Sequence, residues 1–498
     1  MDFSLLLSEL GPAGKQEGKS RQQRLYSLLK RAILDGILVA NTRLPSTRQL
    51  ADDYEIARNS VTWAYDQLRF EGFLVSDHGG TRVKPLPIAA QEPCTVGNTD
   101  GAHARLSVRS ELVQHIRRPS EFLPFMPGVP DLHAFPWRLW SRALQQAWND
   151  IGARHLAYAP PGGEISLRRA IANRLRVDRG LVCDADQVLV TAGAQMALDV
   201  CARMLADFND IAWMEDPGYY QARSVMESAG LKVEAVPVDS DGMVVDDERW
   251  TRSPPRMIFL TPSHQYPMGS VLSLPRRLEF LKRATQYGTW LIEDDYDSEF
   301  HYGATQITAL QGIAPDASVV YIGTFSKSLF PGLRIGYMVV PKWACARIAE
   351  GLHEYFRPGQ AVEQLALARF IESGDLARHI RRMRVRYFRR QGIFREQLQK
   401  YFGADASIHG GSAGMHLTVV FHDEINDIAL SRKAAELGIT VPPLSAYVNS
   451  RRQEHTPCGM VLGYGVVKDE TIERLVPRLR WAFDEVANRC VDQLNPHL

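Results

Sequence analysis

The stretch YIGTFSKSLFPGLRIGY combines one lysine, small hydroxyl residues and one arginine around a Pro-Gly break. Lys327 follows an apolar run, with Thr324 and Ser326 just before it. Arg334 comes seven residues later, after the break has turned the chain back. An amine can capture an aldehyde, while hydroxyls and a guanidinium can bind a phosphate. These residue types suit pyridoxal phosphate, and the alternative is a surface lysine in a loop.

A second stretch, LIEDDYDSEF, places two adjacent carboxylates at the end of an apolar strand. Open α/β sheets present ligand-binding groups at the carboxyl ends of their strands. Asp294 or Asp295 could therefore keep the pyridine nitrogen of the cofactor protonated. Tyr296 follows closely enough to hydrogen-bond the phenolic oxygen of the cofactor.

Two further strand ends carry groups that a phosphorylated ring needs. VLVTAGAQMAL predicts a strand, a glycine-containing turn and a helix start, so the backbone N–H groups of Gly193, Ala194 and Gln195 suit a phosphate. EDPGYYQAR ends another strand with Tyr219, a candidate to stack on the ring. Each feature is ordinary in a core or a turn, but their coincidence at strand ends favours a cofactor site.

Residues 1–84 predict a different kind of unit, a winged helix-turn-helix that is mainly α. QRLYSLLKRAILDGIL has apolar residues at helical spacing, and those expected on one side are Leu25, Leu28, Leu29, Ile33 and Ile37. A short helix follows with Ser46 as its N-cap, and a third helix ends at Gly72. FLVSDHGGTRVKPL alternates, turns at two glycines and alternates again, which predicts a hairpin.

Such a unit reads DNA with the first residues of its third helix, which enter the major groove. Arginine pairs with guanine and asparagine with adenine, and arginines at the turn and on the wing suit phosphates. The candidate DNA contacts are Arg43, Ser46, Arg48, Arg58, Asn59, Ser60, Thr62 and Arg82. The alternative is a solvated face that mediates only protein contacts.

The remaining composition sets limits on class and organisation. A chain of 498 residues requires more than one domain, and a net charge of +1 means that any nucleic-acid binding must be local. Six scattered cysteines show no zinc spacing and predict reduced thiols. No window approaches the roughly 20 apolar residues of a membrane helix, and no secretion signal is evident, so we expect a cytoplasmic protein without membrane contact.

Composition also divides the chain. Residues 85–119 are rich in Pro, Gly, Ala and polar residues and predict a flexible linker. In residues 120–498, short apolar strands alternate with helices, which predicts an α/β body whose parallel or mixed sheet is covered on both faces. Beyond about Arg381, long charged helices precede the strands GMHLTVVF and GMVLGYGVV, which predicts a smaller α+β C-terminal lobe.

Residues from about Gln22 to Val83 closely resemble the DNA-binding domain of GntR-type bacterial regulators. The resemblance rests on LPSTRQLA, ARNSVTWAYDQL and EGFLVSDHGGTRV. The wing tip differs, because this chain has His-Gly-Gly-Thr where such proteins often have Gly-Ser-Gly-Thr.

Residues from about Phe125 to Ala482 resemble class I aminotransferases, the fold-type I pyridoxal-phosphate proteins. The resemblance implies that Lys327 forms the internal aldimine and that Tyr296 contacts the phenolic oxygen. It selects Asp294 for the pyridine nitrogen, because the family has Asp and then Tyr two or three residues on.

The chain departs from this family at two places. TPSHQYPMG stands where an Asn-Pro-Thr-Gly turn is usual, so His264 or Gln265 is expected to replace the asparagine. Val461 stands where an arginine would hold a substrate carboxylate. Arg223 and Arg451 are the remaining candidates for anchoring an effector carboxylate.

Together, the two halves resemble the MocR/GabR family of bacterial transcriptional regulators. The resemblance implies a pyridoxal-phosphate-dependent regulator of a double-stranded DNA operator, which senses an amine or a cofactor vitamer and forms a head-to-tail homodimer. One alternative is an active aminotransferase with an appended DNA-binding domain. Another is a GntR regulator whose large domain only dimerises it.

Overall fold

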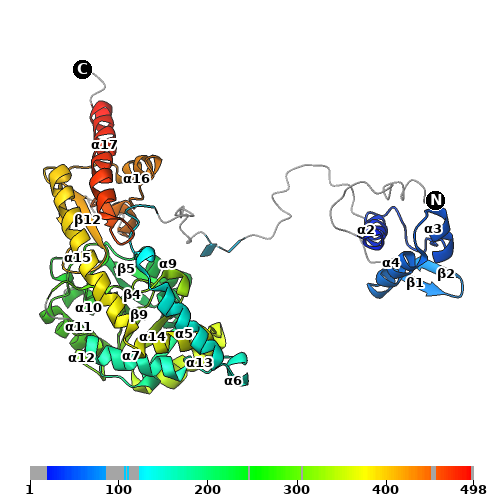
Figure 1. Cartoon of the computed structure of the whole chain (residues 1–498), viewed down its shortest axis with the longest axis horizontal. Helices are drawn as coiled ribbons and strands as arrows, with labels where there is room; N and C mark the ends of the chain where they lie inside the picture. The colour runs from blue at the N-terminus through cyan, green and yellow to red at the C-terminus, as the bar shows by residue number, and fades with distance from the viewer. Residues whose placement is uncertain are drawn as a thin grey trace. The chain divides into compact units, whose positions relative to one another are not determined.

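The computed structural model describes residues 20–85, 106–107, 109–110, 123–244, 247–303, 307–449 and 456–494. The chain divides into two compact units, residues 1–106 and 107–498 (Figure 1). Most of the linker predicted for 85–119 lies outside the described residues.

The first unit is a winged helix-turn-helix. Its elements are α2 (Arg21–Leu34), α3 (Thr47–Asp53), α4 (Arg58–Phe70), β1 (Leu74–Asp77) and β2 (Gly80–Val83). The two strands pair antiparallel, with Leu74 opposite Val83 and Asp77 opposite Gly80. The apolar faces of the three helices close on one core that includes Leu29, Val61 and Leu68, all fully buried. The predicted three helices and hairpin are therefore confirmed.

The predicted buried side of the first helix was wrong at its end. Helix α2 stops at Leu34, and Gly36 takes a φ of +73°, a left-handed conformation that glycine adopts without strain. The chain therefore leaves the helix before Ile37, whose side chain is 46% exposed. Leu38 is buried in its place.

The second unit contains an eight-stranded mixed sheet. Its strands are β3 (Val188–Thr191), β4 (Ile211–Asp216), β5 (Lys232–Asp239), β6 (Gly242–Met243), β7 (Met257–Leu260), β8 (Trp290–Asp295), β9 (Val319–Thr324) and β10 (Gly336–Val339). They lie in the order β3-β10-β9-β8-β7-β4-β5-β6, and β10 and β6 run antiparallel to their neighbours. The apolar strands expected at VLVTAGAQMAL, before EDPGYYQAR, at LIEDDYDSEF and at YIGTFSKSLFPGLRIGY are present as β3, β4, β8 and β9.

Helices cover both faces of this sheet. On one face lie α5 (Trp137–Asn149), α7 (Ile165–Asp178) and α14 (Ala361–Glu372), and on the other lie α8 (Ala194–Leu205), α9 (Tyr220–Ser228) and α13 (Cys345–Phe356). Neighbouring residues of one strand join different cores, as when Val188 and Val190 pack with the first set and Leu189 with the second. Burial on both faces explains why these strands are continuous apolar runs.

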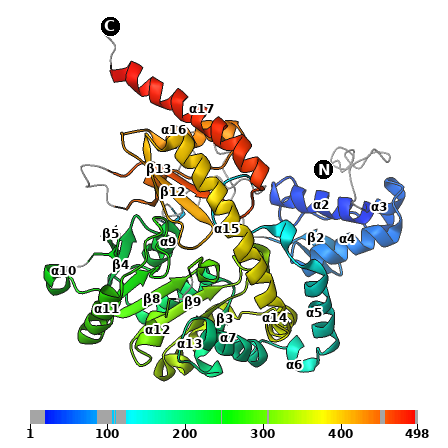
Figure 2. The same ribbon diagram turned by 60° about the vertical axis from the view of Figure 1, so that its left-hand side comes forward.

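A smaller α+β lobe completes the second unit. Strands β11 (Ala406–His409), β12 (His416–Phe421) and β13 (Gly459–Gly463) form an antiparallel sheet, packed by α15 (Asp375–Phe402), α16 (Asp427–Glu436) and α17 (Asp469–Leu494). Figure 2 shows α15 running from the large sheet into this lobe. None of the described helices combines the length and apolarity needed to cross a bilayer.

Two phenylalanines of α15, one buried and one exposed, allow a matched test of the lobe's packing. Phe394 of α15 is fully buried, and its ring stacks on Phe125 with centroids 4.8 Å apart, whereas Phe388 is 58% exposed. We expect Phe394→Ala to lower the free energy of unfolding by about 3–5 kcal/mol, because it leaves a cavity. Phe388→Ala should change it by about 0.5 kcal/mol or less. Urea unfolding followed by circular dichroism measures both, and equal losses would contradict the packing described.

Candidate cofactor site and DNA-reading unit

Three loops of the second unit meet at one edge of the large sheet. Strands β8 and β9 run parallel, with Asp294 opposite Ile322, so both end at the same edge. Strand β10 pairs Gly336 with Thr324 of β9 and with Thr191 of β3. The loop that carries Lys327 therefore lies beside the turn before α8.

The two aspartates at the end of β8 have separate partners because successive side chains leave a strand on opposite faces. Asp295 accepts from Ser298 and lies 2.7 Å from Nε of Arg179, on the α7 face. Asp294 is buried, and its Oδ1 has no hydrogen-bond partner among the described residues. A buried, unpaired carboxylate oxygen is costly, so the free oxygen of Asp294 favours a site for a ring N–H.

The electrostatics of Asp294 agree with this role. Burial is the main cause that raises its pKa to about 7, and the neighbouring Asp295 raises it further. Lys327 acts in the opposite direction and lowers it. A second cation at the free oxygen would favour the charged carboxylate still more.

Lys327 is partly buried, and its Nζ donates a 2.8 Å hydrogen bond to the carbonyl oxygen of Gly128. A Cβ at position 128 would lie 2.7 Å from this Nζ, so a larger residue would displace the end of the lysine side chain, and the φ of +74° at Gly128 also favours glycine. Burial lowers the pKa of Lys327, while Asp297 and then Asp294 oppose the shift. The amine is therefore easier to deprotonate than an exposed lysine, as a nucleophile requires.

Residues expected to bind the cofactor phosphate lie at the turn into α8 and in the loop that follows Lys327. Gly193 precedes α8 with a φ of +90°, and a Cβ there would lie 3.4 Å from the Arg334 guanidinium. Arg334 donates to the carbonyl of Ala192 at 2.9 Å, which fixes it against this turn. The helix start at Ala194 and Gln195 supplies free N–H groups and the positive end of the helix dipole.

Two hydroxyls lie at the end of the strand that leads to the lysine and just beyond it. Thr324 Oγ1 and Ser326 Oγ are 3.1 Å apart, and the Ser326 N–H also donates to Thr324. Thr324 is the last residue of β9 and the register partner of Gly336, whose Cβ would lie 2.8 Å from Gly193. The structure thus brings the hydroxyl pair next to the turn that holds Arg334.

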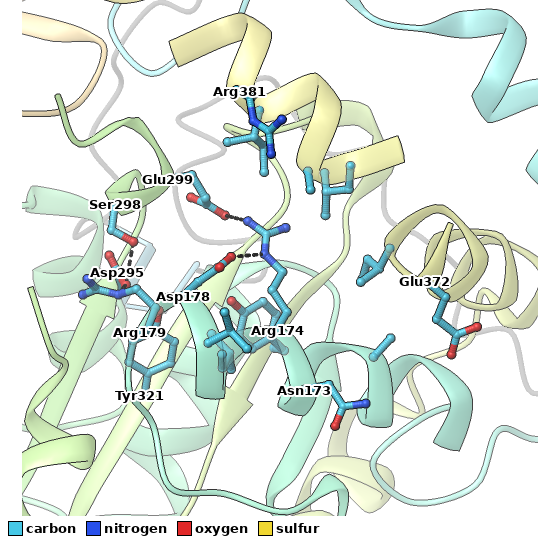
Figure 3. A pocket seen from close by; sticks show the side chains of 18 of the residues that line it. Asn173, Arg174, Asp178, Arg179, Asp295, Ser298, Glu299, Tyr321, Glu372 and Arg381 are labelled. Carbon is cyan, nitrogen blue, oxygen red and sulfur yellow. Dashed lines mark hydrogen bonds and ion pairs between the residues drawn. The ribbon is translucent and has the colours of Figure 1, made fainter. Parts of the chain in front are cut away.

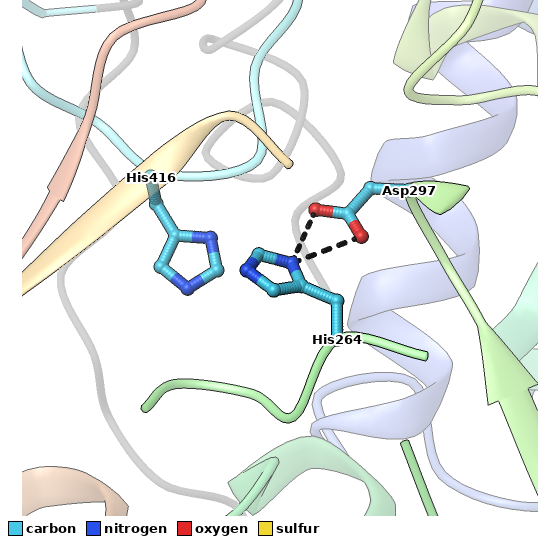
Figure 4. A group of neighbouring side chains, drawn as sticks. All are labelled: His264, Asp297 and His416. Carbon is cyan, nitrogen blue, oxygen red and sulfur yellow. Dashed lines mark hydrogen bonds and ion pairs between the residues drawn. The ribbon is translucent and has the colours of Figure 1, made fainter. Parts of the chain in front are cut away.

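Tyr296 is held by a buried histidine-aspartate pair (Figure 4). Its hydroxyl lies 3.0 Å from Nδ1 of His264, which is 3.1 Å from Asp297. His416 completes a cluster whose potential ligand atoms lie within 4.8 Å of one another, as in a metal site. Nδ1 of His264 contacts both Asp297 and Tyr296, whereas its buried Nε2 has no hydrogen-bond partner among the described residues. Nε2 of His416 lies 3.1 Å from the carbonyl oxygen of Pro267. The contacts of Nδ1 place His264 against the Tyr296 hydroxyl.

His264 and Gln265, the two candidates to replace the asparagine usual in class I aminotransferases, differ in their contacts. The Gln265 amide donates to the carbonyl of Pro217, which follows β4, and to that of Tyr266, and it accepts from the Met268 N–H. His264 instead contacts Tyr296. This geometry favours His264 as the residue that would lie near the phenolic oxygen of the cofactor.

An aromatic wall stands next to Tyr296. Tyr219 precedes α9, and its ring centroid is 5.9 Å from that of Tyr266, which lies 5.6 Å from Tyr296. The hydroxyls of Tyr266 and Tyr447 are 3.1 Å apart. Tyr219 thus lies where a ring held by Tyr296 could be stacked.

Of the two candidate effector arginines, the structure describes Arg223. Val461 is fully buried in β13 and packs with Leu444 and Tyr447. Arg223 is hydrogen-bonded to the side-chain oxygen of Asn449. Arg451 lies outside the described residues.

The first unit presents its predicted DNA contacts on exposed positions. Arg58, Asn59 and Thr62 are exposed at the start of α4, and Ser60 is partly buried. Arg48 is exposed on α3, whose N-cap is Ser46 through a 3.1 Å bond from the Gln49 N–H.

Two arginines meet at the wing. The backbones of Arg43 and Arg82 pair in an isolated antiparallel β-bridge. A Cβ on Gly80 would lie 3.1 Å from the Arg43 side chain. A Cβ on Gly79 would lie 3.3 Å from the Arg82 side chain. Gly80 also takes a φ of +112°, a left-handed conformation that favours glycine at this turn.

Comparison with known families matches both units. Residues 21–83 match the family "Bacterial regulatory proteins, gntR family", and residues 131–474 match "Aminotransferase class I and II". The chain is 37% identical to the probable rhizopine catabolism regulatory protein MocR of Rhizobium meliloti over 93% of each chain. It belongs to the MocR-type transcriptional regulators.

Other relatives share this architecture. The pyridoxine biosynthesis regulator PdxR of Corynebacterium glutamicum is 31% identical, over 95% of this chain and 96% of its own. A kynurenine aminotransferase of Pyrococcus horikoshii matches the fold alone, with a TM-score of 0.69 and 23% identity over 76% of this chain and 97% of its own. As a MocR-type regulator, the protein joins a DNA-binding domain to a fold-type I body that binds pyridoxal phosphate.

The residues of this regulator fit that cofactor on structural grounds. The buried free oxygen of Asp294 matches a ring nitrogen, and the Lys327 amine lies against Gly128, where a Cβ would displace it. Gly193 and Arg334 enclose the start of α8, where a phosphate would be bound.

Two contributors were missed from the sequence. Gly128 lies 199 residues before Lys327, and no local pattern connects them. Asp297 is the second, since its charge is the main one that raises the pKa of Lys327 against the effect of burial. It is present in LIEDDYDSEF but lies beyond the strand end, so the sequence carried no signal for it.

The lowered pKa of Lys327 predicts how cofactor uptake depends on pH. A neutral amine attacks the aldehyde, so the uptake rate should rise with pH and level off below the ordinary lysine pKa of 10.5. Asp297→Asn removes a charge that raises this pKa, so its profile should move to lower pH, whereas exposed Asp316→Asn should leave it unchanged. Stopped-flow absorbance measures the rates. A shift to higher pH in Asp297→Asn would contradict the assignment.

Proposed function

We propose that the regulator senses pyridoxal phosphate, or an amine that reacts with it, and converts occupancy of the site into altered DNA binding. The observation that carries the proposal is the Lys327 amine beside the unpaired buried oxygen of Asp294, in a chain that also contains a GntR-type reader. The cytoplasm is the compartment where such a reader meets its operator.

Different residues of the site would bind different parts of the cofactor. Bound pyridoxal phosphate supplies an aldehyde for amines and a ring that withdraws electrons. Lys327 would hold the aldehyde end covalently, Asp294 the ring nitrogen and Tyr296 the phenolic oxygen. The groups assigned to the phosphate are Gly193, Ala194, Gln195, Thr324, Ser326 and Arg334, and Tyr219 is assigned to the ring face.

Sensing is favoured over turnover by the region around Val461. An aliphatic side chain packed against Leu444 and Tyr447 offers no charge to a substrate carboxylate. A relative named as a regulator of pyridoxine biosynthesis supports the cofactor vitamer as one effector. Arg223 and Arg451 remain our candidates for anchoring the carboxylate of an amino compound.

The response requires two states with different affinities for the effector. We propose a head-to-tail homodimer in which closure of the C-terminal lobe shifts where the linker holds the two readers. An effector can move this equilibrium only by its differential affinity for the two states.

Aminotransferase activity is the second candidate, because the amine, the carboxylate and the phosphate-binding residue types are present and, of the cofactor contacts, only the family asparagine is replaced. A catalyst would release keto acid over many turnovers when supplied with an amino acid and a second keto acid. A sensor would react at most once for each bound cofactor.

The start of α4 gives a direct test of DNA reading. Arg58→Ala should weaken operator binding by about 1–3 kcal/mol, because a base-reading side chain is lost. Arg69→Ala is the matched control at the other end of the helix, where Arg69 pairs with Asp66. Fluorescence anisotropy with DNA from upstream of the gene measures both, and equal effects would remove α4 as the reading helix.

A second titration links the two units. We expect pyridoxal phosphate to change the DNA affinity of the native protein but not that of Lys327→Ala, because the replacement cannot attach the cofactor. Lys342→Ala, which changes a lysine in the loop after β10, should respond like the native protein. The sensing proposal fails if Lys327→Ala responds to the cofactor as the native protein does.

A further inference from the structure

A second cavity lies on the opposite face of β8 from the cofactor groups. It has a volume of about 490 Å³ and is bounded by α7, the end of α14, the start of α15, the end of β8, and strands β9 and β10 (Figure 3). Asp295 lines it, whereas Asp294 leaves the strand on the other face. Its volume falls within the usual range for small-molecule sites, about 300–1,000 Å³.

The floor of this cavity is apolar and aromatic. Tyr321 and Tyr337 lie on adjacent strands with their rings nearly parallel and centroids 6.4 Å apart. Leu376 and Ile380 of α15 are buried beside them. Such a floor can cover the apolar body of a ligand, and flat aromatic faces suit a ring.

The upper wall carries guanidinium groups with nitrogen atoms that no carboxylate of the described chain contacts. Arg381 forms no ion pair or hydrogen bond with any residue that the structure describes. Arg384 donates only to the backbone carbonyl of Glu299, at 3.0 and 2.8 Å. Buried Nη1 of Arg174 also has no hydrogen-bond partner in the described part of the chain. Figure 3 shows Arg174 reaching up from α7, with Arg381 above it.

Acidic side chains also line this cavity. Asp178 and Glu299 both lie against the guanidinium of Arg174, at 3.0 and 3.4 Å. Asp295 is paired with Arg179 at 2.7 Å. Glu372 lies apart from this group on α14 and is exposed, as Arg381 is. Four arginines and four carboxylates line the cavity, so among the residues described it offers unpaired guanidinium nitrogens at Arg381 and at Nη1 of Arg174 rather than a net positive charge.

We propose that this cavity is a second ligand site, separate from the cofactor site, which takes an organic anion with an apolar or aromatic body. The ring or chain would lie on Tyr321 and Tyr337. The carboxylate would meet Arg381 and the free nitrogen of Arg174, since guanidinium groups bind carboxylates through paired hydrogen bonds.

A fluorinated probe tests this site directly. Fluorine NMR would follow 4-(trifluoromethyl)phenylacetate on the full-length protein saturated with pyridoxal phosphate, so that the cofactor site is filled. We expect saturable binding, and about tenfold weaker binding of the matching uncharged amide. Arg381→Ala should weaken binding of the acid about tenfold, whereas Arg378→Ala, one turn earlier and paired with Asp375, should not.

A filled cavity provides a test independent of charge. Ala377→Trp places an indole in the cavity and should abolish binding, while Val385→Trp, on the same helix but outside this cavity, should preserve it. Circular dichroism would verify that both variants fold. The proposal is overturned if the acid fails to bind saturably, if Arg381→Ala binds it like the native protein, or if Ala377→Trp still binds it.

Discussion

Asp294 and Asp295 end the same buried strand, and the backbone sends their side chains to opposite faces of the sheet. The Arg179 ion pair and the Ser298 hydroxyl engage Asp295 on the α7 side. Asp294 keeps an oxygen free beside Lys327, where burial raises its pKa to about 7. The cofactor site depends on this division, because one carboxylate anchors the strand end while the other stays available for a ligand.

The surrounding fold maintains that arrangement. Antiparallel β10 lies between β3 and β9, which places the Arg334 turn against the start of α8. The C-terminal lobe supplies His416, which lies beside His264 behind Tyr296, and Val461, which packs with Leu444 and Tyr447. A site built from both parts of the body would respond to their relative movement, which is the property that a sensor requires.

Much of this could be predicted from the sequence because strand ends and turns leave local signals. Apolar runs followed by Gly, Asp or Lys identified the edge of the sheet, and Ser46 identified the start of α3. Contacts between distant segments left no such signal, so the Gly128 carbonyl at Lys327 was missed. Helical periodicity also failed at Ile37, because a left-handed Gly36 ended the helix first.

The central claim is that the amine of Lys327, and no other, receives the cofactor in this site. The most direct measurement is peptide mapping by mass spectrometry after the native protein is mixed with pyridoxal phosphate and reduced with borohydride. The account predicts one modified peptide, the one that contains Lys327. An unmodified Lys327, with the mass gain absent or distributed over other lysines, would contradict it.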